Sequence, residues 1–403
     1  MRVCFFTENF YKGGLDTFLI NLFNAWPEKS DDLTLLCNAT HPGLDIIEAK
    51  VIRPVHIKRY NQDFVSKLAH GQNASKYFSY FAIRAFFVLL QYLILFPWYV
   101  LRLTIYFLRS DFDRLMVVNG GYPASLLCRS SMIAWRLSGK HRYGILNFHN
   151  SSTLPSKFLG VFEWFIDILV EWSSEKIISV SRNCINSISN RRVFTDATKL
   201  DYIYNGIQDP VNSTGIDKNT IGETIDNRYC LLLATYEPRK GHTYLLEAFK
   251  DVVNEFPDVL LKIYGDGKDY EKQQVEDVVK RLSMEKNVSL NGFTTDASSL
   301  IANATVLVVS SQAYESFGLT IIEAMAYGVP VVTTDVGGIP EVLEGSGAGF
   351  VCSRNNHLEF SDAVKRILSD PSLSLKLGKA GRQTFESRFT ADKMACDYRR
   401  LME

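Results

Sequence analysis

The chain has 403 residues, too many for one ordinary domain and suited to two of roughly 150–200 residues each. Hydrophobic residues make up 46% of the sequence, which is enough for a substantial core in each domain. Lys+Arg and Asp+Glu number 44 each, so the overall charge gives no reason to expect a nucleic-acid partner. The seven cysteines are scattered, which favours reduced thiols over a disulfide frame or a zinc site.

A strand predicted over residues 2–7 opens the sequence and leads through Gly13 and Gly14 into a helix predicted over residues 16–26. This order favours a phosphate or sugar loop, because glycines let a ligand approach the backbone at a helix start. An ordinary turn has the same composition, so both interpretations stay open. The sequence shows no signal-peptide layout before this strand, which favours a cytoplasmic protein.

Residues 77–108 are dense in Phe, Tyr, Leu and Ile, and residues 85–101 carry no charge. Three interpretations arise: a buried helix pair broken at Pro97, a helix lying on a membrane surface, or a transmembrane span. A span needs about 20 apolar residues and would split a two-lobed fold across a bilayer, so we discount it. The cations that would lie at headgroup level are Lys67, Lys76, Arg84, Arg102 and Arg109.

Compact apolar runs predict the remaining strands of two parallel sheets. In the first half they cover residues 33–37, 115–119, 143–148, 176–180 and 200–204. In the second half they cover residues 229–234, 260–264, 288–291, 306–309 and 331–334, followed by a turn and strand at 347–350. Helices are expected over residues 357–369, 371–387 and 391–401. Residues 211–228 contain no aromatic residue and are expected to be a linker or surface loops.

Three polar side chains follow predicted strands. His149 follows the strand over 143–148, where a single histidine is either structural or functional. Arg239 and Lys240 stand together at the strand-to-helix turn after residues 229–234. Adjacent cations at such a turn suit a diphosphate, although a solvated basic loop has the same composition.

Residues 306–341 predict a strand, a loop, a helix over 319–327 and another strand with a glycine turn. Glu315 precedes the helix and Glu323 lies within it; either acid alone could be a solvated surface residue. Together with Gly318, Gly328, Pro330 and the run 337–341, they resemble the signature of family 4 retaining glycosyltransferases (glycosyl transferases group 1). That signature has a Glu, seven residues and a second Glu.

The resemblance implies an α/β protein with the GT-B fold, in which two Rossmann-like, doubly wound lobes face each other across a cleft. Repeated strand–loop–helix units predict the same two lobes. The expected organisation is an acceptor-binding lobe over 1–210 with the insert at 77–108, a linker over 211–228, a nucleotide-sugar lobe over 229–387, and a C-terminal helix over 388–403 that returns to the first lobe. The resemblance is dense over 229–352 and absent from 77–110.

The resemblance also implies roles for single residues. Glu323 would accept hydrogen bonds from the ribose, and Glu315 would hold a hydroxyl of the donor sugar. Lys240 and Arg239 would stabilise the leaving diphosphate. The family has an arginine where this chain has Thr235, so Arg239 either replaces it or one contact is lost. His149 is implied as a catalytic residue on the acceptor side, and Gly13 and Gly14 as a phosphate or acceptor loop. The other residues implied to bind the donor are Ser316, Phe317, Gly318, Leu319, Gly265, Gly292, Phe293 and Thr235.

The activity implied is a retaining hexosyl transfer from a nucleotide-sugar, most simply a UDP-sugar, to a saccharide or lipid-linked saccharide in cell-envelope polysaccharide or lipopolysaccharide synthesis. We expect no cofactor and no metal. The sequence is taken to have no Asp-x-Asp metal motif, which fits stabilisation of the leaving group without a metal. A peripheral contact through residues 77–108 would place the protein at the inner face of the plasma membrane. The alternatives are a non-catalytic nucleotide-sugar-binding or membrane scaffold protein, and a GT-B epimerase or phosphorylase.

Overall fold

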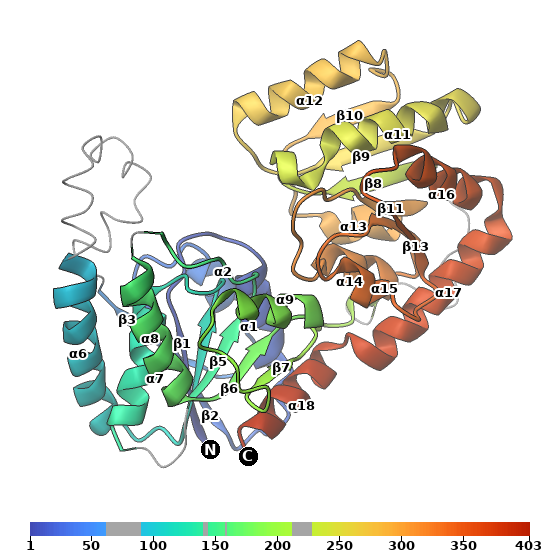
Figure 1. Cartoon of the computed structure of the whole chain (residues 1–403). Helices are drawn as coiled ribbons and strands as arrows, with labels where there is room; N and C mark the ends of the chain where they lie inside the picture. Colours follow the sequence, from blue (N-terminus) through green and yellow to red (C-terminus); the bar gives the residue numbers. More distant parts are fainter. Residues whose placement is uncertain (62–89, 140–143, 158, 212–227) are drawn as a thin grey trace. The chain divides into compact units, whose positions relative to one another are not determined.

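The computed structural model describes residues 1–61, 90–139, 144–157, 159–211 and 228–403 (Figure 1). It forms two compact units, Met1–Tyr204 with Met394–Glu403, and Asn205–Lys393. The first unit therefore ends before the expected limit at residue 210, and the returning segment starts at Met394 instead of residue 388. Residues 212–227 of the expected linker (211–228), the first part of the insert (residues 77–89) and Lys67, Lys76 and Arg84 lie outside the described residues.

The first unit is built on a parallel sheet with the strand order β3-β2-β1-β4-β5-β6-β7. Its strands are β1 (Arg2–Thr7), β2 (Asp32–Asn38), β3 (His56–Tyr60), β4 (Arg114–Asn119), β5 (Gly144–Phe148), β6 (Ser174–Ser179) and β7 (Leu200–Tyr202). The predicted strands of this half are confirmed to within two residues at each end. Strand β3 was not predicted, because an edge strand with the sequence HIKRY has no apolar run.

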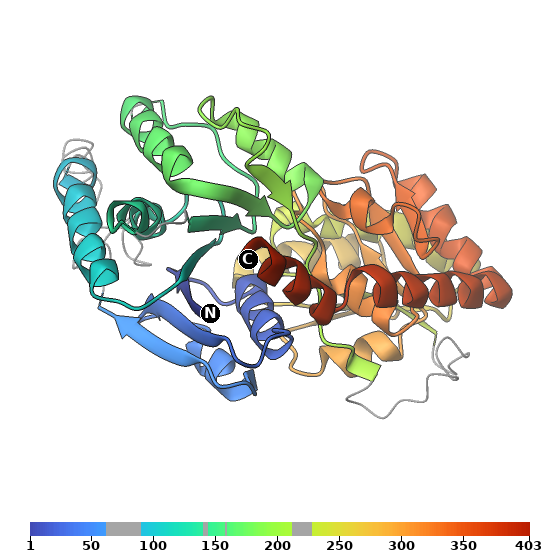
Figure 2. The same cartoon turned by 90° about the horizontal axis from the view of Figure 1, so that it is seen from below.

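Helices cover both faces of this sheet (Figures 1 and 2). They are α1 (Gly14–Asn24), α2 (Leu44–Lys50), the π-helical turn η1 (Gln91–Leu95), α6 (Phe96–Leu108), α7 (Leu126–Leu137), α8 (Gly160–Ser173), α9 (Arg182–Asn186) and the 3₁₀ turn η2 (Ser187–Asn190). Helix α7 packs between α6 and α8 on one side of the sheet.

The described part of the apolar insert is a single helix. Gln91–Leu108 is long and apolar enough to cross a membrane by length and composition, and only 17% of it is buried. The π-helical turn leads directly into α6, and Pro97 falls in the first turn of α6, where a missing N–H is tolerated. The expectation of a buried pair broken at Pro97 is therefore wrong for the described residues.

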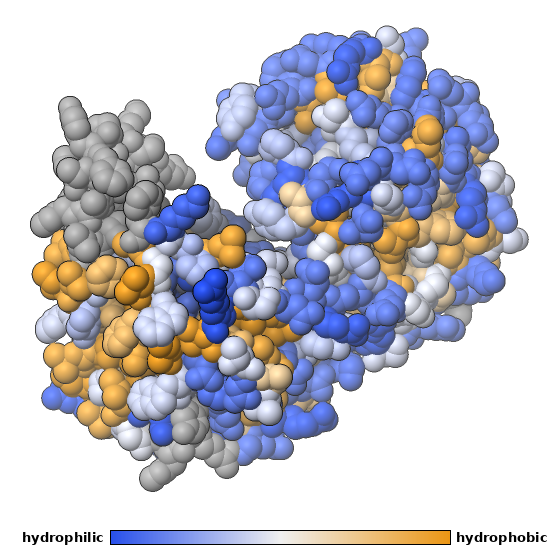
Figure 3. All heavy atoms as spheres, viewed as in Figure 1, coloured by the Kyte–Doolittle hydropathy of each residue, from blue (hydrophilic) through white to orange (hydrophobic). Residues whose placement is uncertain are grey.

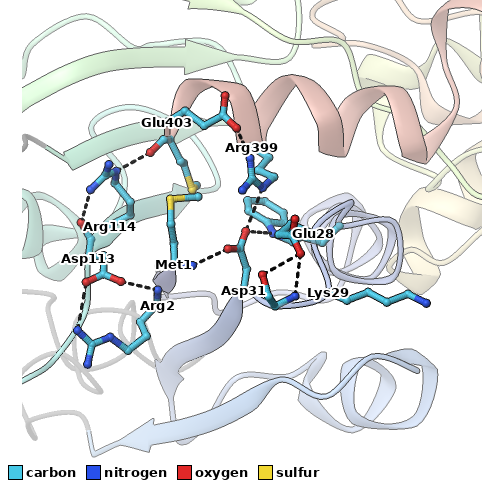
Figure 4. A network of polar contacts seen from close by, with 12 residues as sticks. Met1, Arg2, Glu28, Lys29, Asp31, Asp113, Arg114, Arg399 and Glu403 are labelled. Carbon is cyan, nitrogen blue, oxygen red and sulfur yellow. Dashed lines mark hydrogen bonds and ion pairs between the residues drawn. The ribbon is translucent and has the colours of Figure 1, made fainter.

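The C-terminal helix α18 (Ala391–Leu401) packs its last turns against the first unit (Figure 4). The buried hydroxyl of Tyr398 accepts a hydrogen bond from the side-chain amide of Asn147 at 2.8 Å. Arg399 Nε lies 3.1 Å from Asp31, and Arg114 donates to the carbonyl of Met402. The end of the chain is thus part of the first unit's core.

The second unit has a parallel sheet with the order β10-β9-β8-β11-β12-β13. Its strands are β8 (Tyr229–Leu233), β9 (Leu260–Tyr264), β10 (Val288–Asn291), β11 (Val306–Val309), β12 (Val331–Thr334) and β13 (Gly349–Cys352). Its helices are the 3₁₀ turn η4 (Pro238–Lys240), α11 (His242–Glu255), α12 (Asp269–Arg281), α13 (Ala297–Ala302), α14 (Leu319–Ala326), α15 (Ile339–Leu343), α16 (His357–Ser369) and α17 (Pro371–Arg388).

Both sheets have one point where the strand order reverses along the chain. In the second unit this point lies between β8 and β11, which are neighbours in the sheet although more than 70 residues separate them. In open parallel sheets, ligands bind beyond the carboxyl ends of the strands at such a point. A ligand of this unit is therefore expected beside the loops that follow β8 and β11.

Candidate active site

Hydrogen bonds join the loop after β8 to the loop after β11. The backbone N–H of Gln312 donates to the carbonyl of Arg239 at 2.7 Å, and the hydroxyl of Ser310 donates to the carbonyl of Lys240 at 2.9 Å. Gly241 has φ +73°, and a Cβ there would lie 2.0 Å from the carbonyl oxygen of Ser310. Only glycine permits this approach, so the two loops form one rigid platform.

The platform joins the two predicted charges. Lys240 Nζ lies 2.5 Å from Glu315 Oε2, and Arg239 Nη1 lies 3.9 Å from the same oxygen. Ser311 Oγ donates to that oxygen at 3.3 Å. The Lys240 and Glu315 side chains are 17% and 18% exposed, so the pair is reachable from solvent but largely shielded. The structure thus brings Lys240, Arg239 and Glu315 together.

A carboxylate that the sequence analysis missed, Glu237, orients Arg239. Glu237 accepts from Arg239 Nε at 2.6 Å and from the hydroxyl of Thr235 at 3.1 Å. Burial would raise the pKa of Glu237, but the hydrogen bond and charge of Arg239 outweigh it and lower that pKa. The guanidinium also lies over the ring of Tyr314, 4.9 Å from its centroid. Thr235 and Arg239 are therefore connected through one acid.

Helix α14 starts beside this pair. Gly318 is the residue before the helix and has φ +92°, a backbone conformation that glycine adopts without strain. The side chain of Phe317 is buried against Phe389, with the ring centroids 5.8 Å apart, so only its backbone can meet a ligand. Ser316 is buried and Leu319 opens the helix. The first turn of a helix presents N–H groups suited to an anion.

The glycine turn at residues 337–338 holds the backbone of Glu315. Gly338 N–H donates to the Glu315 carbonyl at 2.8 Å. Gly337 has φ +59°, and a Cβ there would lie 2.1 Å from the Glu315 carbonyl oxygen. The glycine pair therefore lies against the backbone of Glu315, and this contact explains why the chain has glycines at these two positions.

Glu323 lies in α14 and is partly buried. Its carboxylate has no hydrogen bond or ion pair within the described part of the chain. Burial raises the pKa of Glu323 from 4.5 to about 7. A ligand that donates hydrogen bonds to such a buried carboxylate stabilises its ionised form.

The other predicted donor residues end neighbouring strands. Gly265 follows β9, and a Cβ there would lie 1.8 Å from the carbonyl oxygen of Ala234, so this glycine serves close strand packing. Gly292 and Phe293 follow β10, and Phe293 is 77% exposed. These residues lie along the same edge of the sheet as the Lys240–Glu315 pair, because all six strands are parallel.

His149, Gly13 and Gly14 belong to the first unit. His149 follows β5, and the centroid of its ring lies 4.3 Å from that of Phe18. Its buried Nε2 has no hydrogen-bond partner among the described residues. Burial lowers the pKa of His149 to about 3, so the ring is neutral near pH 7. Gly13 and Gly14 begin α1, and the N–H of Gly13 already donates to Asp16 at 3.0 Å. That N–H is thus engaged by a carboxylate.

The chain contains an Asp-x-Asp pair, Asp111 and Asp113, which corrects the expectation that the motif is absent. Asp113 accepts hydrogen bonds from the backbone and side chain of Arg2 (Figure 4). Asp111 lies 3.6 Å from the same guanidinium. Both acids precede β4 and so lie at the amino end of a strand. Within the described ranges, no group of three or more His, Cys, Asp and Glu side chains is placed to hold a metal.

Comparison with protein families gives a match for the second unit. Residues 216–384 match the model described as glycosyl transferases group 1. The match covers most of the second unit. The matched region contains Glu315, Glu323 and Lys240, with the strands and helices that position them.

Similarity to known proteins extends further toward the N-terminus than this match. An uncharacterized glycosyltransferase of Methanocaldococcus jannaschii is 27% identical over 287 residues, 71% of this chain and 75% of the relative. A phosphatidyl-myo-inositol mannosyltransferase of Mycobacterium leprae is 28% identical over 281 residues, 68% of this chain and 69% of the relative. With two other relatives, from Bacillus anthracis and Haemophilus influenzae, the alignment covers less than two thirds of their length, 58% and 47%.

A solved structure covers both units. HepE of Anabaena in complex with UDP and glucose has a TM-score of 0.71, with 17% identity over 100% of this chain and 99% of that one. At this identity the likeness concerns the fold, and it shows that the two parallel-sheet lobes have the GT-B fold of glycosyltransferases. The predicted fold class is confirmed.

Proposed function

We propose that this protein is a retaining glycosyltransferase that transfers a hexose from a nucleotide diphosphate donor, most simply a UDP-sugar, to a saccharide or lipid-linked saccharide acceptor. The observation that carries the proposal is the Lys240–Glu315 pair, 2.5 Å apart beside the start of α14 in the group 1 domain. Cell-envelope glycan synthesis, metal-free catalysis and a place at the inner face of the plasma membrane are parts of the same proposal. The mannosyltransferase relative named for phosphatidyl-myo-inositol supports a lipid acceptor.

In the proposed reaction the acceptor hydroxyl attacks the anomeric carbon from the side that the diphosphate leaves, and its proton passes to the departing diphosphate oxygen. The bond from that carbon to the diphosphate oxygen breaks, and the departing oxygen gains charge beside Lys240, Arg239 and the first N–H groups of α14. Stabilisation that grows as the bond breaks lowers the barrier more than it tightens substrate binding. Glu315 would hold a hydroxyl of the sugar, and Glu323 the ribose.

The test is a screen of nucleotide-sugars by thermal shift, followed by an assay of free nucleoside diphosphate with and without acceptor. A ligand that binds the folded protein raises its melting temperature. Diphosphate release that depends on an acceptor supports transfer, and the anomeric configuration of the product, read by NMR, decides whether it is retained. Donor binding without release would favour a non-catalytic sensor, and consumption of phosphate would favour a phosphorylase.

The raised pKa of Glu323 predicts a pH-dependent donor affinity. Ribose hydroxyls donate to the ionised carboxylate, so binding should tighten as pH rises through about 7. Between pH 6 and pH 8 we expect about a tenfold decrease in the Kd for a UDP-sugar, measured by calorimetry. In Glu323→Gln, affinity should be weaker and independent of pH over this range. An equally steep pH profile in the variant would assign the proton to another group.

The same shift has an opposite effect on stability. A carboxyl whose pKa is higher in the folded than in the unfolded state stabilises the fold below pH 4.5, and this contribution is lost as pH rises through about 7. We therefore expect Glu323→Gln to melt at a higher temperature than the natural protein at pH 8 without donor.

A further inference from the structure

Three helices of the first unit enclose an apolar groove. Helix α7 lies between α6 and α8 (Figure 2). All three helices contribute side chains to the lining of the groove. The groove has a volume of about 1090 Å³ and is lined by side chains that include Phe96, Leu101, Ile133, Leu137, Phe165 and Trp172. Its lining is almost entirely hydrocarbon. We call the outward surfaces of Gln91–Leu108 and α8, with the groove between them, the α6–α8 face.

The α6–α8 face exposes large apolar side chains, visible as an orange patch in Figure 3. Trp98 is 52% exposed, Trp164 54% and Phe165 56%. Trp172, Ile105 and Leu108 are exposed as well. Contiguous apolar patches of this kind on a folded protein mark an interaction site.

The charges of the face favour an anionic partner. No Asp or Glu occurs in Gln91–Leu108 or in α7. The three acids of α8 are engaged elsewhere, because Glu163 and Asp167 are buried beside Arg191 and Glu171 pairs with Lys199. Arg102 on α6 and Arg109 directly after it are exposed, and they follow Trp98 by about one and about three helical turns.

These residue types are those of a membrane–water interface. Tryptophan is enriched where hydrocarbon meets headgroups, and cations on an apolar helix attract anionic lipids. The helix is also fixed to its lobe: Phe96, Tyr99 and Phe107 of α6 are buried, and the rings of Phe107 and Trp135 lie 5.3 Å apart. It is thus placed to lie along a bilayer surface as part of the lobe.

We propose that the α6–α8 face docks on the surface of an anionic phospholipid bilayer and that the groove receives one lipid hydrocarbon chain. This inference deepens the proposed function. Docking would present a lipid-linked acceptor to the enzyme, and that role rests on the proposed function. It adds α8 and the groove to the contact expected from residues 77–108. The docking itself is independent of whether the chain transfers sugar.

The test uses the full chain with vesicles of phosphatidylcholine alone or mixed with phosphatidylglycerol. We expect flotation with the mixed vesicles at low salt, and quenching of tryptophan fluorescence by lipids brominated on their acyl chains. The three exposed tryptophans all lie on the α6–α8 face, whereas Trp26 and Trp135 are buried. The double variant Trp98→Ala with Trp164→Ala should lower the partition coefficient by about tenfold or more.

A matched control is the pair Tyr270→Ala and Leu358→Ala, both 56% exposed and both in the second unit, which should leave partitioning unchanged. Should the tryptophan variant unfold, Arg102→Glu on the exposed side of α6 should reduce binding to the anionic vesicles at an unchanged melting temperature. A UDP-sugar thermal shift on the same proteins separates this inference from the proposed function, since the donor residues lie in the other unit.

Three results would overturn the proposal. The protein could remain at the bottom of the gradient with unquenched tryptophans. It could form a concentration-dependent dimer by light scattering without vesicles, in which case a second copy covers the face. It could resist extraction from membranes by alkaline carbonate, in which case the helix spans the bilayer instead of lying on it.

Discussion

Replacing Lys240 by alanine is expected to lower the turnover rate by about 10² or more at saturating donor. The Lys240 ammonium lies 2.5 Å from Glu315 at the start of α14, where the proposed diphosphate would gain charge as it leaves. Losing one group that stabilises developing charge typically costs about 10²–10³ in rate. The measurement is acceptor-dependent release of nucleoside diphosphate at several donor concentrations, so that kcat is separated from KM.

The variant should keep its fold. Without Lys240, Glu315 retains Arg239 at 3.9 Å and the hydroxyl of Ser311 at 3.3 Å, so its carboxylate is not left without partners. Lys365→Ala is the matched control, because Lys365 is also partly shielded, at 22% exposure, and pairs with Asp362 at 3.0 Å on helix α16. Equal turnover in Lys240→Ala and Lys365→Ala would remove Lys240 from the active site.

Most strands could be predicted from the sequence because they contain short apolar runs, which in β1, β11 and β12 are buried along almost their whole length. The exception, β3, lies at the edge of its sheet and exposes His56, Lys58 and Arg59, so its sequence carries no such signal. The course of the apolar insert was only partly predictable. Pro97 suggested a break, and the π-helical turn that lets the helix continue has no recognisable pattern of residues.

The candidate site could also be predicted only in part. Lys240 and Glu315 lie 75 residues apart, and no local pattern joins them; the expected fold does, by placing β8 beside β11. The partners of single side chains could not be predicted. That Glu237 orients Arg239 depends on rotamers, and that Phe317 points into the core depends on Phe389, which lies far along the chain.

Position 337 gives the second large expected effect, because its backbone supports Glu315. In Gly337→Ala the new Cβ would lie 2.1 Å from the Glu315 carbonyl oxygen, closer than any stable contact, so the loop carrying Glu315 must move. Misplacing a positioning group by about 1 Å can cost 10²-fold in rate. We therefore expect turnover to fall by about 10² while the second unit remains folded.

The chain offers a control for the backbone strain itself. Gly345 has φ +66°, close to the +59° of Gly337, but a Cβ at Gly345 meets no atom within 4 Å. Gly345→Ala therefore carries the strain of an L-residue in the left-handed region, about 1–2 kcal/mol, without moving Glu315. Both variants should melt at lower temperatures, and only Gly337→Ala should lose turnover. If the two variants turned over equally, the glycine turn would be a matter of stability alone, and its hydrogen bond to the Glu315 backbone would have no part in positioning the donor.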